Sequence, residues 1–233
     1  MKRSEINARV RDAIYFFESH CFILPPFAHW GVGAWPENRE PIREIIDNGL
    51  GWDITDYGQG RFDELGLLLF TVRNGSSAER GKTGHKSYAE KVMIVNVDQV
   101  TPMHYHWSKT EDIINRGGGT LKIKLYAADE QDELSDVDVA FSADGIRYTK
   151  PAGHIASLSP GESITLTPKL YHSFWAEDKR VFVGEISSVN DDHSDNCFLE
   201  SLSRFSDINE DEPPFRLLVS DYAKHFGGTT YSL

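Results

Sequence analysis

Cysteine is scarce in this chain of 233 residues, which contains only Cys21 and Cys197. Small secreted domains that lack a large core are stabilised by a framework of several disulfide bridges, and two cysteines cannot supply one. We therefore expect a hydrophobic core to hold the fold together. Hydrophobic residues make up 39% of the chain, which is enough to fill one core.

Long apolar runs are also absent. No stretch of the sequence stays apolar for the length that a membrane span or the centre of a secretion signal requires. We predict from this that the protein has no membrane partner and that it is cytoplasmic.

Basic residues are outnumbered by acidic ones. Lys and Arg together number 24 against 36 Asp and Glu, which gives a formal net charge of −12. Nucleic acids and anionic membranes are themselves negative and offer no counter-charge to such a protein, so we expect neither as a partner. A small neutral substrate would be indifferent to this charge.

Linkers, internal repeats and low-complexity segments are missing as well. Closed β-barrels of this length commonly form one domain. We therefore interpret residues 1–233 as a single domain, with residues 1–60 as a helical and loop extension and residues 61–233 as a barrel with a C-terminal segment.

Two helices are predicted, both near the N-terminus. Ile6, Val10, Ile14 and Phe17 recur at helical spacing after Ser4, a plausible N-cap. Residues 38–48 are predicted to form a second, short helix, because Asn38 can cap its start and Gly49 follows its end. The loop between these helices is rich in proline and aromatic residues.

Strand patterns dominate from residue 65 onward. Leu121, Ile123 and Leu125 alternate with polar residues, as in a half-buried strand. Further strands are predicted at residues 67–72, 92–97, 137–141, 146–149, 154–158, 163–166 and 180–186. So many short strands, with helices only near the ends, predict an all-β fold, an antiparallel double-sheet roll with a pocket at one end.

A candidate metal site stands out among these strands. His104 and His106 point to the same face if their segment is extended, and residues 108–110 can turn the chain so that Glu111 returns to them. A lone His-x-His pair in a strand is more often ordinary than metal-binding, but Glu111 and the distant His172 favour a site of three imidazoles and one carboxylate. This ligand set suits Mn²⁺, Fe²⁺, Co²⁺, Ni²⁺ or Zn²⁺.

The spacing of these residues resembles the first motif of the cupin superfamily. That motif runs His-x-His, four residues, Glu, six residues, Gly, and here it ends in the triple glycine at residues 117–119. His172 stands where the second cupin motif has its histidine. The match departs from the usual Pro-x-Gly before that histidine, because Pro168 is followed by Lys169 and Leu170.

Residues 92–119 are, more specifically, similar to the D-lyxose isomerase family of cupins. Further segments that carry the similarity are residues 24–30, 51–58, 190–192 and 210–216, so the resemblance extends over essentially the whole chain. It implies a cupin jelly-roll barrel with the N-terminal helices packed outside, a homodimer, and a metal-dependent aldose–ketose isomerase usually served by Mn²⁺. The implied substrates are the monosaccharide pairs D-lyxose and D-xylulose, and D-mannose and D-fructose.

Isomerisation needs a general base that is not itself a metal ligand. Glu210 and Glu212 are the candidates, although an acidic run of this kind is ordinarily a solvated loop; the resemblance favours catalysis without choosing between the two. Lys109 lies between the ligands His106 and Glu111. It is the candidate for donating to a substrate oxygen, because a cation beside a metal needs an anion or substrate to offset repulsion.

Four other residues are candidates for substrate contact. Trp107 and Trp175 flank metal ligands and could offer a flat face to the sugar, although aromatics in such places are often simple packing. Arg216 could orient a nearby carboxylate, or it could be a surface arginine. His29 lies in the proline-rich loop that could cover the pocket.

Two other function classes fit the same metal constellation. A cupin oxygenase would use Fe²⁺ to activate O₂, and a non-catalytic sugar-binding cupin would hold carbohydrate without turning it over. The spacing of ligands does not separate these from an isomerase.

Overall fold

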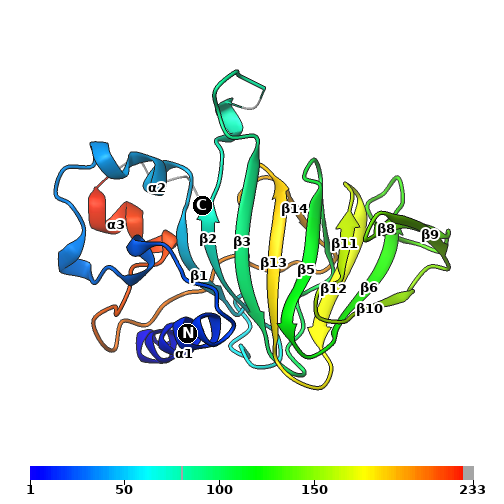
Figure 1. Cartoon of the computed structure of the whole chain (residues 1–233), viewed down its shortest axis with the longest axis horizontal. Coiled ribbons are helices and arrows are strands. Elements are labelled where there is room, and N and C mark those ends of the chain that lie inside the picture. Colours follow the sequence, from blue (N-terminus) through cyan, green and yellow to red (C-terminus); the bar gives the residue numbers. More distant parts are fainter. Residues whose placement is uncertain (80, 228–233) are drawn as a thin grey trace.

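Two antiparallel sheets face each other in the computed structural model, which describes residues 1–79 and 81–227 (Figure 1). The large sheet contains, in order, β1 (Gly51–Thr55), β2 (Leu67–Arg73), β3 (Tyr88–Val95), β13 (Val181–Ser188), β5 (Glu111–Gly118), β11 (Ser163–Leu166), β8 (Val139–Ala143) and β9 (Ile146–Lys150). The small sheet contains β10 (Ile155–Leu158), β6 (Leu121–Ala128), β12 (Leu170–Ala176), β4 (His104–His106) and β14 (Asn196–Phe198), while β7 (Leu134–Ser135) pairs with β6. The predicted double-sheet roll is confirmed.

The strands follow the alternation of the sequence. In β6, Leu121, Ile123 and Leu125 are fully buried, whereas the intervening Lys122 and Lys124 are only partly covered. Since side chains of a strand alternate between faces, the apolar set of β6 meets apolar residues of the large sheet, such as Ile113 and Val183, in one core between the sheets.

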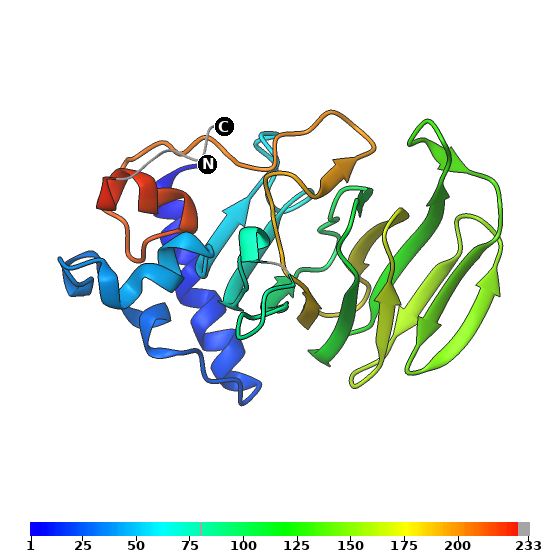
Figure 2. The same cartoon turned by 90° about the horizontal axis from the view of Figure 1, so that it is seen from above.

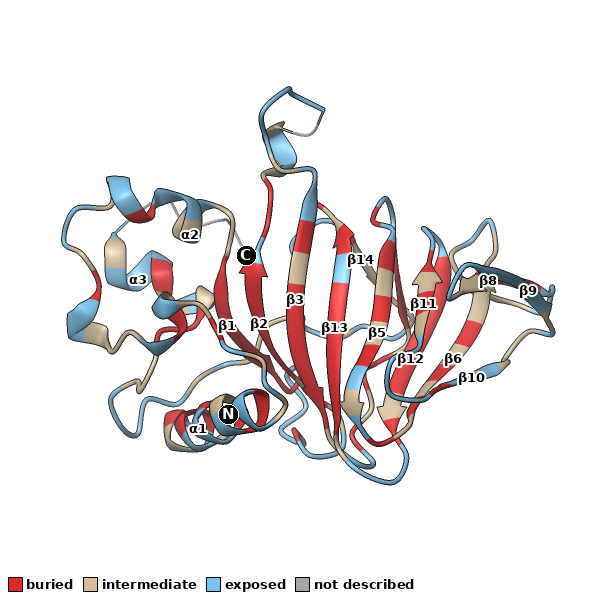
Figure 3. Cartoon of the chain, in the orientation of Figure 1, coloured by how far each residue is buried: buried red, intermediate tan, exposed pale blue. Residues whose placement is uncertain are grey.

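The helices gather at one end of the sheets (Figures 1 and 2). Helix α1 (Arg3–Ser19) packs on the outer face of the large sheet, where Phe17 lies 5.2 Å from Phe182 and 6.4 Å from Trp52 between ring centroids. Figure 3 shows the buried strands beneath it, in contrast to β9 at the opposite end, whose residues are mostly exposed. The helix pattern was predicted correctly, since Ile6, Val10 and Phe17 form its buried stripe.

The start of α1 was predicted wrongly. Ser4 lies inside the helix and Lys2 is the N-cap residue. The Ser4 hydroxyl donates instead to Asp211 at 2.7 Å, and its backbone N–H donates to the same carboxylate. Ser4 therefore ties the helix to the C-terminal part of the chain rather than capping it.

The second helix is shorter than predicted. A 3₁₀ turn (Glu40–Ile42) leads into α2 (Arg43–Asp47), and the Asn38 side chain accepts a hydrogen bond from the Glu40 N–H at 3.1 Å. Near the C-terminus, a 3₁₀ turn (Val219–Asp221) leads into α3 (Tyr222–Phe226), and Tyr222 packs against Trp35. No helix of the described residues combines the length and apolarity that crossing a membrane would take.

The expected boundary of the N-terminal extension needs a correction. Strand β1 lies within residues 1–60, which were expected to hold helices and loops only, and it pairs with β2 along its whole length. Trp52 and Ile54 alternate with the polar Asp53 and Thr55, so the sequence does carry a strand pattern there, but it spans only five residues.

The triple glycine closes the turn between β5 and β6. A Cβ atom on Gly118 would lie 2.2 Å from the Arg180 carbonyl oxygen, and Gly118 has a φ of +98°, which favours glycine. The buried Asn115 amide donates to the carbonyls of Gly119 and Leu158 at 2.9 and 2.8 Å. This turn fixes the end of the strand that begins with Glu111.

Removing the Phe17 ring should test how α1 is attached. We expect Phe17→Ala to lower the free energy of unfolding by about 3–5 kcal/mol, because a fully buried ring is deleted from between packed neighbours. Urea denaturation measures this change. Tyr15→Ala on the same helix is the control, since Tyr15 is 70% exposed and its loss should change the free energy by about 0.5 kcal/mol at most.

Candidate metal centre and pocket

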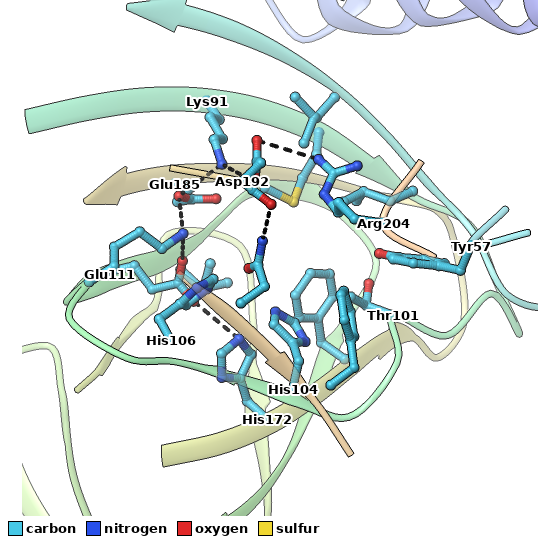
Figure 4. Close-up of a pocket in the computed structure, with 18 residues that line it drawn as sticks. Tyr57, Lys91, Thr101, His104, His106, Glu111, His172, Glu185, Asp192 and Arg204 are labelled. Carbon is cyan, nitrogen blue, oxygen red and sulfur yellow. Dashed lines mark hydrogen bonds and ion pairs between the residues drawn. The ribbon is translucent and has the colours of Figure 1, made fainter. Parts of the chain in front are cut away.

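Three histidines converge on the inner face of the small sheet (Figure 4). His104 and His106 come from β4, and His172 comes from β12, where it pairs directly with His104. The side chains of His104 and His106 share a face because they are two residues apart on a strand. One ring nitrogen from each of the three buried residues lies within 4.8 Å of the others, so the group could hold a metal ion. Their predicted convergence is confirmed.

Each imidazole is oriented through its Nδ1 atom. Nδ1 lies 2.7 Å from the Pro102 carbonyl in His104, 3.3 Å from the Asp195 carbonyl in His106, and 3.0 Å from the Leu170 carbonyl in His172. A protonated Nδ1 donates to each carbonyl, which leaves Nε2 as the free lone pair. Nε2 of His172 is buried and forms no hydrogen bond, although Oε1 of Glu111 lies 3.1 Å from it, as expected of an atom whose natural partner is a metal ion.

Glu111 lies beside two of these histidines. Its Oε1 atom lies 3.1 Å from Nε2 of His172 and 3.4 Å from Nε2 of His106. The turn predicted at residues 108–110 is present and is held by Asp195, whose carboxylate accepts the backbone N–H of Ser108 at 2.8 Å and of Lys109 at 3.0 Å. Three converging imidazoles, with a carboxylate beside two of them, fit a divalent ion of the first transition row.

The protonation states suit metal binding. Burial, followed by the neighbouring histidines, holds the pKa of His104 well below its usual value, and burial with nearby Lys109 lowers the pKa of His106. Burial alone would raise the pKa of Glu111, but Lys109 and His106 outweigh it and hold that pKa well below its usual value. Neutral imidazoles and an ionised carboxylate are the forms that bind metal.

Lys109 is buried beside this group. Its Nζ atom lies 2.6 Å from Oε2 of Glu111 and 2.9 Å from Oε1 of Glu185. Burial favours the neutral amine, but the two carboxylates outweigh it and raise the pKa of Lys109. Lys109 therefore stays protonated, close to where the three histidines meet.

The sequence analysis missed a second polar cluster on the large sheet. Glu185 of β13 and Lys91 of β3 are buried opposite each other, 3.6 Å apart between Oε1 and Nζ, and Lys91 Nζ lies 3.8 Å from Oδ1 of Asp192 (Figure 4). A signal for the first two exists in the sequence. Lys91 and Glu185 each stand at an inward-facing position of a mostly apolar strand, where the alternation would predict a core residue.

Arg204 closes the wall of the pocket next to this cluster. Its Nη2 atom lies 2.5 Å from Asp53 and 3.5 Å from Asp192, while its buried Nη1 has no hydrogen-bond partner. Burial alone would raise the pKa of Asp192, but Lys91 and Arg204 hold it well below the usual range. The pocket therefore presents Nη1 of the positively charged Arg204 as a hydrogen-bond donor that has no protein partner.

The pocket that all these groups line is open to solvent. Apolar side chains complete it, namely Leu67, Leu69, Met93, Ile113, Phe174 and Phe198. A ligand that fits this lining is small and carries both hydroxyl groups and apolar C–H surface, as a monosaccharide does.

The two glutamates predicted as the general base lie elsewhere. Glu210 forms an ion pair with Arg3 at 2.8 Å, and Glu212 accepts from the Asn7 amide at 2.6 Å. Both contacts are with the start of α1, and neither glutamate lines the pocket. The structure therefore does not bring the two glutamates to the pocket, because the acidic run is used here to hold a helix.

The four predicted substrate contacts also lie outside the pocket lining. Trp107 is 44% exposed and Trp175 is half-buried; both alternate with inward-facing neighbours, so they point to the outer face of the small sheet. The Arg216 guanidinium stacks on the Phe215 ring at 3.7 Å. His29 is exposed in a 3₁₀ turn (Pro26–His29).

The sequence of this chain is similar to a known family and to individual members of it. A model described as D-lyxose isomerase matches residues 1–222. A Serratia proteamaculans protein called D-lyxose/D-mannose isomerase is 50% identical over 227 residues, 96% of this chain and 99% of the relative. An Escherichia coli O157:H7 protein of the same name is 49% identical over 225 residues, 95% of this chain and 98% of the relative.

Solved structures share the fold. An L-ribose isomerase from Geodermatophilus obscurus superposes with a TM-score of 0.60 at 15% identity, covering 90% of this chain and 98% of that one. A Cellulomonas parahominis L-ribose isomerase with L-psicose gives the same TM-score, identity and coverage. At 15% sequence identity, this structural similarity establishes the cupin-like fold.

The lowered pKa values predict how pH affects stability. Because the pKa of His104 is lower in the folded than in the unfolded chain, the unfolded chain binds more protons as the pH falls below about 6.5, and folding stability declines. Chelator-treated protein should therefore lose unfolding free energy between about pH 7.5 and about pH 5.5.

Urea denaturation at the two pH values measures this loss. We expect His104→Asn to reduce the loss, since a titrating group has been removed from the folded interior. The control is His225→Asn at an exposed position, which should leave the pH dependence unchanged. An equal loss in the parent protein and in His104→Asn would contradict the prediction.

Proposed function

This chain belongs to the D-lyxose isomerase family, and from that premise we propose that it interconverts D-lyxose with D-xylulose and D-mannose with D-fructose. It is an enzyme, a sugar isomerase that interconverts aldose and ketose. The observation that carries the proposed chemistry is one pocket in which a buried Glu185 and Lys109 face three converging histidines. The two relatives that are about half identical to the chain support the choice of sugars by their names.

We assign His104, His106, His172 and Glu111 as the residues that hold a divalent ion, with Mn²⁺ as the first candidate and Zn²⁺, Co²⁺, Fe²⁺ and Ni²⁺ as alternatives. Such an ion, when bound, would polarise the oxygens on C1 and C2 of an open-chain sugar and favour negative charge there. The orphaned Nε2 of His172 and the neutral state of His104 and His106 support the assignment.

Glu185 replaces Glu210 and Glu212 as the proposed general base. Isomerisation of an aldose moves one proton from C2 to C1 and one from the C2 hydroxyl to the C1 oxygen. The Glu185 carboxylate would take the proton from C2 and return it to C1. Its position supports this role, because a single ammonium group, that of Lys109, separates it from Glu111.

Lys109 is proposed to move the other proton. As a buried ammonium it can donate its proton to the C1 oxygen and, as the resulting amine, take up the proton that the C2 hydroxyl releases, so Lys109 is regenerated and no net charge is left on the sugar. Its two carboxylate neighbours keep it protonated and aim Nζ into the pocket wall.

Arg204 and Asp192 are proposed to hold the remaining hydroxyl groups of the sugar. The unpaired Nη1 of Arg204 is a donor in need of an acceptor, and the ionised Asp192 is an acceptor beside it. Each hydroxyl group of an open-chain sugar can both donate a hydrogen bond, here to Asp192, and accept one, here from Arg204. Asp192 is less suited than Glu185 as the base, because Arg204 and Lys91 rather than Lys109 are its closest charged neighbours.

We also propose an oligomeric state and a location for the protein. The homodimer is supported by the resemblance to the family, and a cytoplasmic location by the low cysteine content and the lack of a long apolar run.

Turnover should depend on the metal. Purified protein is expected to convert D-lyxose and D-mannose to ketose, to lose this activity after chelation, and to regain it when Mn²⁺ is restored. Ketose formation is followed with chelated protein and Mn²⁺ alone as controls. Absence of ketose from protein with bound metal would defeat the proposal, and oxygen consumption would then distinguish an oxygenase from a sugar-binding cupin.

Glu185→Gln should abolish most of the activity. We expect kcat to fall by about 10²- to 10⁴-fold with metal content unchanged, because an amide cannot accept the C2 proton. The matched control is Glu90→Gln on the neighbouring strand, since Glu90 pairs with Arg73 at 2.8 Å outside the pocket. Full activity in Glu185→Gln would exclude Glu185 as the base.

A further inference from the structure

A long irregular segment carries Arg204 into the pocket. This segment, which we call the strap, comprises residues 199–217 between β14 and the 3₁₀ turn at Val219–Asp221, and it contains no helix or strand. Long segments without secondary structure are uncommon in compact domains and are frequently functional. Figure 2 shows the strap, in orange, running from β14 toward the helices and the N-terminus.

The strap is tied to the start of α1 by a series of polar contacts. The N-terminal ammonium donates to the Asp207 carbonyl at 2.7 Å, and Asn209 exchanges backbone hydrogen bonds with Met1 and Arg3 at 2.9 Å each. Further along, Asn7 receives the Phe215 N–H at 2.8 Å. These bonds join the two ends of the chain.

Arg3 is the strongest of these ties. It is fully buried, and its guanidinium donates to Glu210 at 2.8 Å from both Nε and Nη2, and to Asp221 at 3.0 Å from Nη1 and 2.7 Å from Nη2. A buried charge is costly unless its partners satisfy it in a defined geometry. Four charge-assisted bonds from one planar group specify that geometry in a way that a lysine cannot.

Arg204 depends on where the strap is held. On one side of it, Leu199 donates to the Met103 carbonyl at 3.0 Å; on the other, the Ser206 hydroxyl accepts the Asp56 N–H at 2.8 Å. Residues 207–212 follow directly and are the ones bound by α1. A shift of this anchored part would be transmitted to Arg204 through a few residues of irregular chain.

We propose that Arg3 is a positioning residue for sugar binding, which clamps Glu210 and Asp221 and thereby keeps the strap and Arg204 in the pocket wall. The role of Arg204 rests on the proposed function, whereas the anchoring of the strap does not. The acidic run at residues 209–212 thus serves the active site indirectly.

Trypsin offers a direct measurement of the anchor, because it cleaves after arginine and reaches Arg204 only when the strap opens. In the Mn²⁺-treated full chain, Arg3→Lys and Glu210→Gln should each speed cleavage after Arg204 by about tenfold. Fragment masses identify the site. Arg9→Lys is the matched control, since Arg9 lies on the same helix, pairs with Asp63 at 2.9 Å and should leave cleavage unchanged.

Kinetics with D-mannose test the link to binding. Arg3→Lys should raise KM by about tenfold with kcat nearly unchanged, and it should add no further increase in an Arg204→Ala background. Multiplying effects in the double variant would overturn the link to Arg204. The proposed anchoring of the strap would be contradicted if Arg3→Lys and Glu210→Gln left the rate of cleavage after Arg204 unchanged. It would also be contradicted if they accelerated cleavage after lysines within the sheets to the same extent. A parent protein without turnover would refute the proposed function, and the cleavage rates would still decide on the anchor.

Discussion

A buried ammonium between two buried carboxylates is the interaction on which the pocket depends. Lys109 separates Glu111 from Glu185, and without its charge two carboxylates of neighbouring strands would face each other in a region shielded from water. Lys91 and Arg204 extend the same alternation of sign to Asp192. The space between the sheets can therefore hold a polar site at one end and an apolar core at the other, because every charge in the site has a partner of opposite sign.

The sequence was most informative where one residue type and its spacing determine the geometry. The His-x-His pair on a strand, the turn at residues 108–110 and the alternation of residues 121–125 each predict local structure, and the fold and the convergence of the histidines followed from them. Two residues one strand-repeat apart leave few ways to arrange them, so the local predictions needed no knowledge of the remainder of the chain, whereas the place of His172 came from the cupin resemblance.

Prediction failed where chemistry depends on contacts between distant segments. Glu210 carries the same side chain as Glu185, but it meets the buried Arg3 at the start of α1, away from the pocket. Only the pairing of β13 with β3 and β5 brings Glu185 into the pocket. Arg204 reaches the site through an irregular segment that has no pattern to read. Strand β1 was missed although Trp52 and Ile54 alternate with Asp53 and Thr55, because a pattern of only five residues is a weak signal.

The direct pairing of His172 with His104 couples ligand geometry to strand register. Side chains alternate with a period of two, so a slip of one residue between β4 and β12 would turn the imidazoles of one strand away from those of the other. An ion held by all three would therefore bind one alignment of the small sheet and no neighbouring alignment. Metal uptake during folding would then act as a proofreading step, which enriches correctly aligned chains by mass action.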